Sequence, residues 1–347
     1  MAVIQELLQG RNESINYDLL LSQYPWIAER NKFCVLSPDS DGLLCGLFMS
    51  QVRGWKVVGF YDDKVSVINK NFVSKDVVFL DGEIFRKGAR SMGHHMVCLN
   101  NKKRQLLSDG FANCIQPNLM RNYDGKHHFR LKYPLATIHM LVSIIAYADK
   151  DTDHPVCLSK EAVSPLFFTD GVFNVLFSYP ENVLNWFHYL RIGENWNPLK
   201  NIFENSMSVF ETMQMMDEFF RMRDSISVGS ERGDRLKISD KRGEPYNIEG
   251  LGSGSVHINE DAAQRIKEFC SLVGGLTGWQ FVENQWQCWQ DLKYYKFTKS
   301  SFKSDARKMT IAAFEDFILN IKPLSWAQTS TTDIEYTKEH PDKFDFL

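Results

Sequence analysis

The chain has 347 residues, of which 44% are hydrophobic and 24% are charged, and its formal net charge is −3. This composition is typical of a globular protein with a substantial core, in one large domain or two ordinary ones. It argues against a protein that coats nucleic acid through bulk positive charge, because phosphate binding needs an excess of cations. The apolar segments are too interrupted to span a bilayer and the first residues do not form a leader, so we expect a cytoplasmic protein without membrane association.

Residues 1–30 carry apolar positions at helical spacing and predict a helical lead-in. After them, short β-branched segments predict four strands, and a helix-spaced segment, 43–55, joins the first two. This order is the βαβ pattern of a parallel sheet. We therefore predict an α/β fold whose main domain, 31–223, contains a Rossmann-like parallel sheet. The predicted strands are 33–37, 56–61, 76–80 and 95–99.

The second half of the chain begins with apolar helices and then changes in composition. A segment rich in glycine and charge, 224–259, predicts a connection to a smaller α+β domain, 260–330, followed by a polar tail, 331–347. Within the smaller domain, the aromatic segment 278–297 predicts a hairpin. Its aromatic side chains could stack on nucleobases, but a core role is the favoured interpretation. These side chains are Trp279, Trp286, Trp289, Tyr294 and Tyr295.

Acidic residues follow the predicted strands. Asp39 and Asp41 come directly after the first strand, and Asp81 directly follows the segment 76–80. Ligands of open α/β sheets collect beyond the carboxyl ends of the strands, so we expect these carboxylates to converge there. Like charges at close range disfavour joint ionisation, and a divalent cation would remove the conflict. His94 and His95, at the start of the predicted strand 95–99, would suit Mn²⁺, Zn²⁺ or Fe²⁺ better than Mg²⁺.

These motifs resemble those of the DHH phosphoesterases, which include RecJ-type exonucleases, oligonucleotide and cyclic-dinucleotide phosphodiesterases and manganese pyrophosphatases. The resemblance covers residues 31–195. The stretch SPDSDG at 37–42 is similar to the first motif, and the strand that ends in Asp81 is similar to the second. Gly93-His94-His95 resembles the DHH signature with glycine in place of its aspartate. FANCIQPN at 111–118 resembles a segment that follows the signature, and SPLFFTDG, with Asp170, resembles the fourth motif.

The resemblance implies a centre of two Mn²⁺ ions, with Mg²⁺ as an alternative. Asp39 would bind one ion and Asp41 the other, while Asp81 would bridge them. His94 and Asp170 would be further ligands of the second ion. Two such ions can activate a water and hold phosphorus in line, so the implied activity is hydrolysis of phosphodiester bonds.

The implied substrate is single-stranded nucleic acid or a short oligonucleotide, with His95 facing its phosphate. The segment 86–132 contains ten Lys and Arg residues against two Asp residues. These cations would either attract a polyanion or form an ordinary solvated surface. The expected contacts are Arg86, Lys87, Arg90, Lys102, Lys103 and Arg104. The sequence also leaves open a homo-oligomer or a complex with other proteins.

Two departures from the family pattern keep alternatives open. Gly93 replaces the acid that normally orients the histidine pair, and Ser37 or Val35 stands where RecJ-like members have a further acid. The main alternative is therefore a catalytically inactive relative that binds nucleic acid or a protein partner. A haloacid-dehalogenase phosphatase, with Asp39 as nucleophile, is a more remote alternative, because Leu43 stands where that class has threonine.

Overall fold

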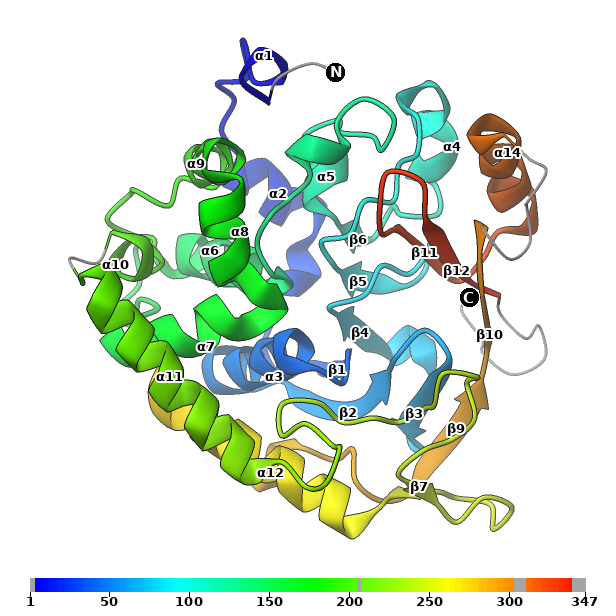
Figure 1. Ribbon diagram of the computed structural model, residues 1–347. Helices are drawn as coiled ribbons and strands as arrows, with labels where there is room; N and C mark the ends of the chain where they lie inside the picture. The colour runs from blue at the N-terminus through cyan, green and yellow to red at the C-terminus, as the bar shows by residue number, and fades with distance from the viewer. Residues whose placement is uncertain (1–3, 205–206, 303–309, 339–347) are drawn as a thin grey trace.

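The computed structural model describes residues 4–204, 207–302 and 310–338, and its centre is a seven-stranded sheet (Figure 1). The strand order is β6-β5-β4-β1-β2-β3-β9. The first five strands in this order are parallel, whereas β3 is antiparallel to both of its neighbours. The predicted α/β class is thus confirmed, with a mixed sheet. The strands are β1 (Phe33–Leu36), β2 (Lys56–Tyr61), β3 (Val65–Asn69), β4 (Val77–Leu80), β5 (Arg90–Met92), β6 (Cys114–Ile115) and β9 (Leu292–Lys296).

The predicted βαβ unit is confirmed as β1, α3 (Ser40–Arg53) and β2. Both faces of this part of the sheet are covered, so its strands are apolar throughout rather than alternating. Cys34 and Leu36 face the main hydrophobic core, while Val35 faces a second core on the other side. Because β1 is buried on both faces, it carries apolar side chains only. The first polar side chains follow it, at the edge of the sheet where the strand ends.

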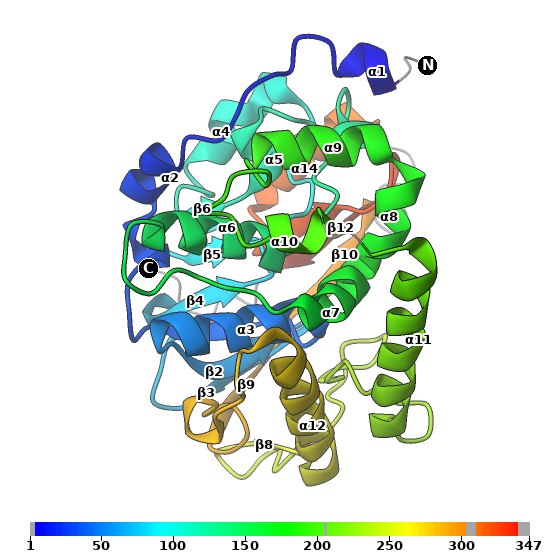
Figure 2. The same ribbon diagram turned by 90° about the vertical axis from the view of Figure 1, so that its left-hand side faces the viewer.

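Helices cover one face of the sheet, where α3 packs against α6 (Thr137–Asp149) and α12 (Glu260–Thr277) (Figure 2). Residues 137–146 of α6 are all buried, as its apolar sequence predicts. No helix of the described residues is long and apolar enough to cross a membrane. The other helices are α1 (Ile4–Leu7), α2 (Tyr17–Gln23), α4 (Arg104–Ser108), α5 (Pro117–Met120), α7 (Val163–Phe168), α8 (Val172–Ser178), α9 (Pro180–Tyr189), α10 (Lys200–Phe203), α11 (Val209–Ile226) and α14 (Ile311–Ile321).

A three-stranded sheet, in the order β10-β12-β11, lies beside the main sheet at the right of Figure 1. It is tied to the segment after β5, since Trp326 Nε1 donates to the Val97 carbonyl at 2.7 Å. The small sheet comprises β10 (Thr298–Ser301), β11 (Ser325–Gln328) and β12 (Ile334–Lys338), and the strands β7 (Ile248–Glu249) and β8 (His257–Ile258) form a separate pair.

Two predictions of secondary structure were wrong, and the segment predicted as a polar tail contains a strand. Residues 95–99 are not a strand of the main sheet; β5 lies earlier, at 90–92, and the apolar residues after it are buried in a core shared with the small sheet. The segment 278–297 is not a hairpin, because 292–296 join the main sheet as β9. The expected polar tail contains β12 at 334–338, and its last residues, 339–347, lie outside the described residues.

Candidate metal centre

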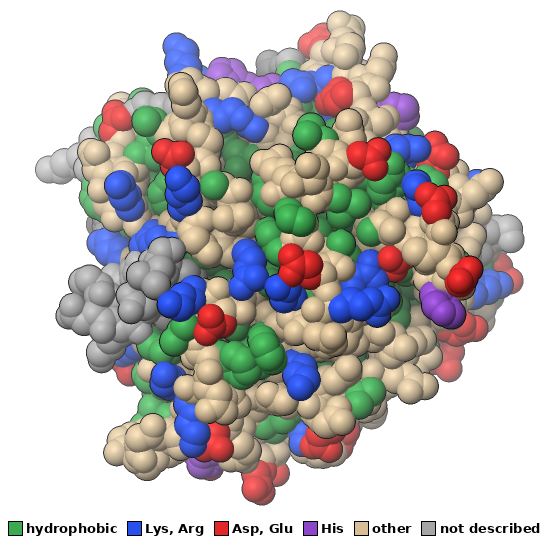
Figure 3. Space-filling view, turned by 180° about the vertical axis from the view of Figure 1, so that it is seen from behind, with side chains coloured by type: hydrophobic (Ala, Val, Ile, Leu, Met, Phe, Trp, Pro, Cys, Tyr) green, Lys and Arg blue, Asp and Glu red, His purple; other side chains and the backbone are tan. Residues whose placement is uncertain are grey.

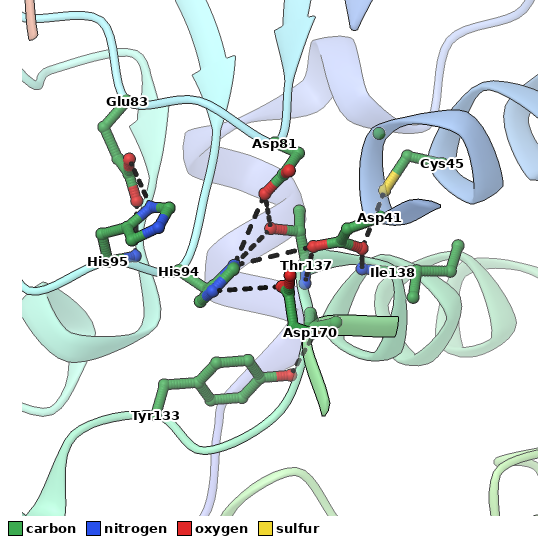
Figure 4. A network of polar contacts seen from close by, with 12 residues as sticks. Asp41, Cys45, Asp81, Glu83, His94, His95, Tyr133, Thr137, Ile138 and Asp170 are labelled. Carbon is green, nitrogen blue, oxygen red and sulfur yellow. Dashed lines mark hydrogen bonds and ion pairs between the residues drawn. The ribbon is translucent and has the colours of Figure 1, made fainter. Parts of the chain in front are cut away.

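Asp41, Asp81 and His94 converge at one edge of the main sheet (Figure 4). One ligand atom of each lies within 4.8 Å of the others, and they form the only such group found in the described part of the chain. They follow β1, β4 and β5, which are adjacent and parallel, so their carboxyl ends lie at the same edge. His94 reaches this edge because it follows β5, and not because it precedes a strand at 95–99 as predicted.

Asp41 is fully buried in the first turn of α3 and also caps a second helix. Its Oδ2 accepts the N–H of Thr137 at 2.7 Å, and its Oδ1 accepts the N–H of Ile138 at 2.9 Å. These are the first two residues of α6, whose own N-cap residue, Ala136, has no side-chain oxygen. Burial and the nearby Asp81 charge raise the pKa of Asp41 well above its usual range. Oδ1 also lies 3.9 Å from the Cys45 Sγ, whereas Oδ2 has a further lone pair for a cation.

Thr137 also orients the other two members of the group. Its hydroxyl donates to Asp81 Oδ1 at 2.8 Å and lies 2.8 Å from His94 Nδ1. Asp81 adopts a left-handed backbone conformation with φ 60°, which aspartate tolerates better than most residues. Burial acts to raise the pKa of Asp81, but the hydrogen bond and charge of His94 outweigh it and hold that pKa well below its usual range. Asp81 is therefore held in the anionic form that a metal ligand needs.

Asp39 and Asp170 flank the group. Asp39 is the N-cap residue of α3 and accepts the Gly42 N–H at 3.4 Å. Burial and the charges of Asp81 and Asp170 raise the pKa of Asp39 to about 7. Asp170 Oδ2 lies 3.4 Å from His94 Nε2, and burial raises the pKa of Asp170 as well. This accumulation of repelling carboxylates suits a site for divalent cations, which would offset the repulsion.

His95 lies beside the group, with its ring stacked on that of His94 at a centroid distance of 4.5 Å. Its Nδ1 lies 3.2 Å from Oε2 of Glu83. Burial acts to lower the pKa of His95, but the Glu83 carboxylate outweighs this effect and raises it to about 10. His95 is thus held as a cation next to the carboxylates, in a position to face an anionic ligand.

The segment 111–118 holds the main chain of the histidine pair. Gln116 Nε2 donates to the His95 carbonyl, and Asn118 Nδ2 donates to the His94 carbonyl at 2.9 Å. Both amide side chains are buried. The resemblance placed this segment only after the histidine signature, and no role was predicted for either residue.

The centre lies at the junction of two cavities. One, of about 250 Å³, is lined by Asp39, Asp81 and Glu83 and by the cations Lys64, Arg235 and Lys299. The other, of about 800 Å³, is lined by the cations Arg130 and Lys132 and by aromatic rings. Both cavities are lined by His94, His95, Asp170 and Thr329. A group bound at the two histidines and Asp170 would therefore be accessible from both sides.

Of the predicted basic contacts, none whose side chain the structure describes lines either cavity. Arg90 Nη2 donates to the Lys75 carbonyl at 3.0 Å, and Arg104 donates to the Leu119 carbonyl. On the face shown in Figure 3, Lys and Arg side chains alternate with Asp and Glu. The predicted contacts that line neither cavity are Arg86, Lys87, Arg90, Lys102 and Arg104, while the side chain of Lys103 lies outside the described residues.

The tryptophans of the aromatic segment 278–297 have a structural role. Trp279, Trp286 and Trp289 are buried in the main core, which confirms the favoured interpretation of those rings and rules out base stacking on them.

No protein-family model, no curated protein and no solved structure matches this chain. What the centre does must therefore be inferred from its own residues.

Proposed function

We propose that this protein is a metal-dependent phosphodiesterase that hydrolyses single-stranded nucleic acid or short oligonucleotides, with Mn²⁺ as the preferred cation and Mg²⁺ as an alternative. The proposal depends on one observation: ligand atoms of Asp41, Asp81 and His94 lie within 4.8 Å of one another beside an open cavity. Two carboxylates and an imidazole are a donor set that suits Mn²⁺.

The residues divide into ligands and residues that orient them. Asp41, Asp81 and His94 would hold one cation, and Asp39 and Asp170 would complete a site for two. Bound cations would supply an activated water and neutralise the charge that develops on the phosphate. No side chain need act as a nucleophile, so the aspartates serve only to bind and to fix the cations.

The two cavities support a substrate that extends on both sides of the reacting phosphate. The larger cavity contains cations, Arg130 and Lys132, next to the rings of Phe129, Tyr133 and Tyr179. Cations beside aromatic rings are the usual means of binding a single strand, since cations pair with phosphates and rings stack on bases. The volume of about 800 Å³ falls in the range of small-molecule sites.

The test is a cleavage assay with and without Mn²⁺ on 5′-labelled single-stranded DNA, short RNA, the dinucleotide pApA and cyclic dinucleotides. We expect Mn²⁺-stimulated cleavage of at least one substrate, and its reduction to background in Asp81→Asn and His94→Ala. Asp151→Asn is the matched control, because this side chain is 83% exposed and borders neither cavity. The absence of Mn²⁺-stimulated cleavage in the wild type would contradict the proposal.

A second candidate is an inactive protein that binds nucleic acid or a partner through the same centre. It is favoured by the finding that both oxygens of Asp41 already accept hydrogen bonds from α6. This candidate predicts binding of single-stranded nucleic acid without turnover, and binding that survives Asp81→Asn. A haloacid-dehalogenase type of phosphatase would instead give a trapped phospho-aspartate at Asp39.

A further inference from the structure

The residue before the histidine pair has no side chain, and the Glu83 carboxyl group occupies the space that a side chain there would fill. A Cβ atom added at Gly93 would lie 2.5 Å from both Cδ and Oε1 of Glu83. Cβ atoms essentially never lie this close to other heavy atoms, so any side chain at 93 would displace the Glu83 carboxyl group.

Glu83 contacts His95 at two points (Figure 4). Its Oε1 accepts the backbone N–H of His95 at 2.6 Å, and its Oε2 lies 3.2 Å from His95 Nδ1. One carboxylate therefore restrains both the main chain and the ring of this residue. Glu83 is only 5% exposed, whereas the His95 side chain is 44% exposed, so a buried group holds one that faces the cavities.

The backbone on both sides of Glu83 is anchored, which fixes where its carboxylate can reach. The Gly82 N–H donates to the Met92 carbonyl at 3.0 Å, and the Ile84 N–H donates to Ser91 Oγ at 3.2 Å. Both partners belong to β5, the strand that leads into the histidine pair. The segment after β4 is thus clamped against the end of β5, with Glu83 between the two clamps.

We propose that Glu83 is the positioning residue for His95: it engages the backbone N–H and Nδ1, leaves Nε2 to contact the substrate phosphate, and requires glycine at position 93. This inference rests on the proposed phosphodiesterase function for the role of His95. Residues that orient site residues in this way are typically worth about 10- to 100-fold in activity or affinity when removed.

The first part of the test is kinetic. Glu83→Gln and Gly93→Ala should each lower kcat/KM by about tenfold or more, while their Mn²⁺ affinity, measured by calorimetry, should stay near that of the wild type. In Glu83→Ala, the additional change Gly93→Asp should restore part of the loss, because it returns a carboxylate to the vacated space. Glu29→Gln, an exposed acid paired with Lys32, is the matched control.

Rescue separates positioning from a merely structural role, since a folding defect at Glu83 would not be repaired by a new charge at 93. Unchanged kcat/KM in Glu83→Gln, or no recovery in the double variant, would overturn the proposal.

The second part of the test does not depend on activity. In protein labelled with ¹⁵N-histidine, the Nδ1 signal of His95, assigned by its loss in His95→Asn, should shift in Glu83→Gln and shift back toward its wild-type position in Glu83→Ala/Gly93→Asp. An unmoved signal would overturn the positioning role. If the wild type cleaves no substrate, the phosphodiesterase function fails, and this signal alone decides whether Glu83 orients His95.

Discussion

The Asp41 carboxylate accepts the backbone N–H of Thr137 at 2.7 Å and thereby links the first turn of α3 to the first turn of α6. The hydroxyl of the same threonine contacts Asp81 and His94. The three members of the candidate metal centre are therefore held together through one residue of a buried helix. The centre and the packing of α3 on α6 depend on each other.

We expect Asp41→Asn to destabilise the protein by about 1–2 kcal/mol even without metal, because the amide NH₂ group would face a backbone N–H that needs an acceptor. Asp39→Asn is the matched control: Asp39 is half-buried, its cap contact is long at 3.4 Å, and asparagine is a good N-cap residue. Chemical denaturation in the presence of a chelator measures both free energies of unfolding. Equal stabilities of the two variants would show that Asp41 does not cap α6.

Gly42 allows the close approach of the first turn of α3 to the end of β1. A Cβ atom at this position would lie 2.1 Å from the Ser37 carbonyl oxygen. We expect Gly42→Ala to cost about 1–3 kcal/mol, in the range of other overpacked buried sites. Gly275→Ala, on an exposed part of α12 with no atom within 4 Å of the added methyl group, should instead be neutral or stabilising. Thermal unfolding measures the Tm of Gly42→Ala and of Gly275→Ala. Similar shifts of Tm in the two variants would argue against a close approach of position 42 to Ser37.

His139 should make stability depend on pH. It is fully buried on α6, and burial lowers its pKa to about 4, compared with about 6.5 in an unfolded chain. The unfolded state therefore binds more protons in this range, so the free energy of unfolding should fall as the pH drops from about 6.5 to 4, by up to ~3 kcal/mol from this residue. In His139→Leu this contribution is absent. The wild type should lose stability relative to the variant as the pH falls, and a constant difference would refute the assignment.

Arg235 is the cation that we expect to contact the substrate. It lines the cavity of about 250 Å³, next to the fully buried Leu236, whose N–H donates to the Pro38 carbonyl at 2.8 Å. Arg235→Gln should raise KM about tenfold, equivalent to about 1.4 kcal/mol, with little change in kcat and a smaller effect at high salt. Lys87→Gln should leave KM unchanged, because Lys87 borders neither cavity. A larger rise of KM in Lys87→Gln than in Arg235→Gln would instead favour the substrate contacts predicted from the sequence.

The sequence predicted correctly that Asp39, Asp41 and Asp81 lie at the edge of the sheet where the strands end. A continuous apolar run followed by acids, as before Asp39 and Asp41, indicates a buried parallel strand and the edge where it ends. Thr137 carries no such signal, since a threonine at the start of an apolar helix has many ordinary roles. Its contacts with Asp81 and His94 arise only when α6 packs against α3.

The residues that line the two cavities could not be predicted, because the cavities form through contacts between distant segments. A local run of cations, such as 102–104, does not show which face of the molecule it occupies. Arg235 lies in a segment whose glycine and charge content predicted a connection, yet that segment is bound to the loop after β1. The prediction of a hairpin in the aromatic segment 278–297 was wrong for a similar reason. The pairing of β9 with β3 joins segments that are distant in the chain, and neither strand alone indicates it.

The most direct test of the central claim is anomalous diffraction at the manganese edge from crystals of the protein grown with Mn²⁺. We expect an anomalous peak about 2.0–2.4 Å from ligand atoms of Asp41, Asp81 and His94. A second peak should lie about 3.5–4 Å from the first, on the side of Asp39. Crystals with manganese bound elsewhere on the protein and no peak at these residues would contradict the account.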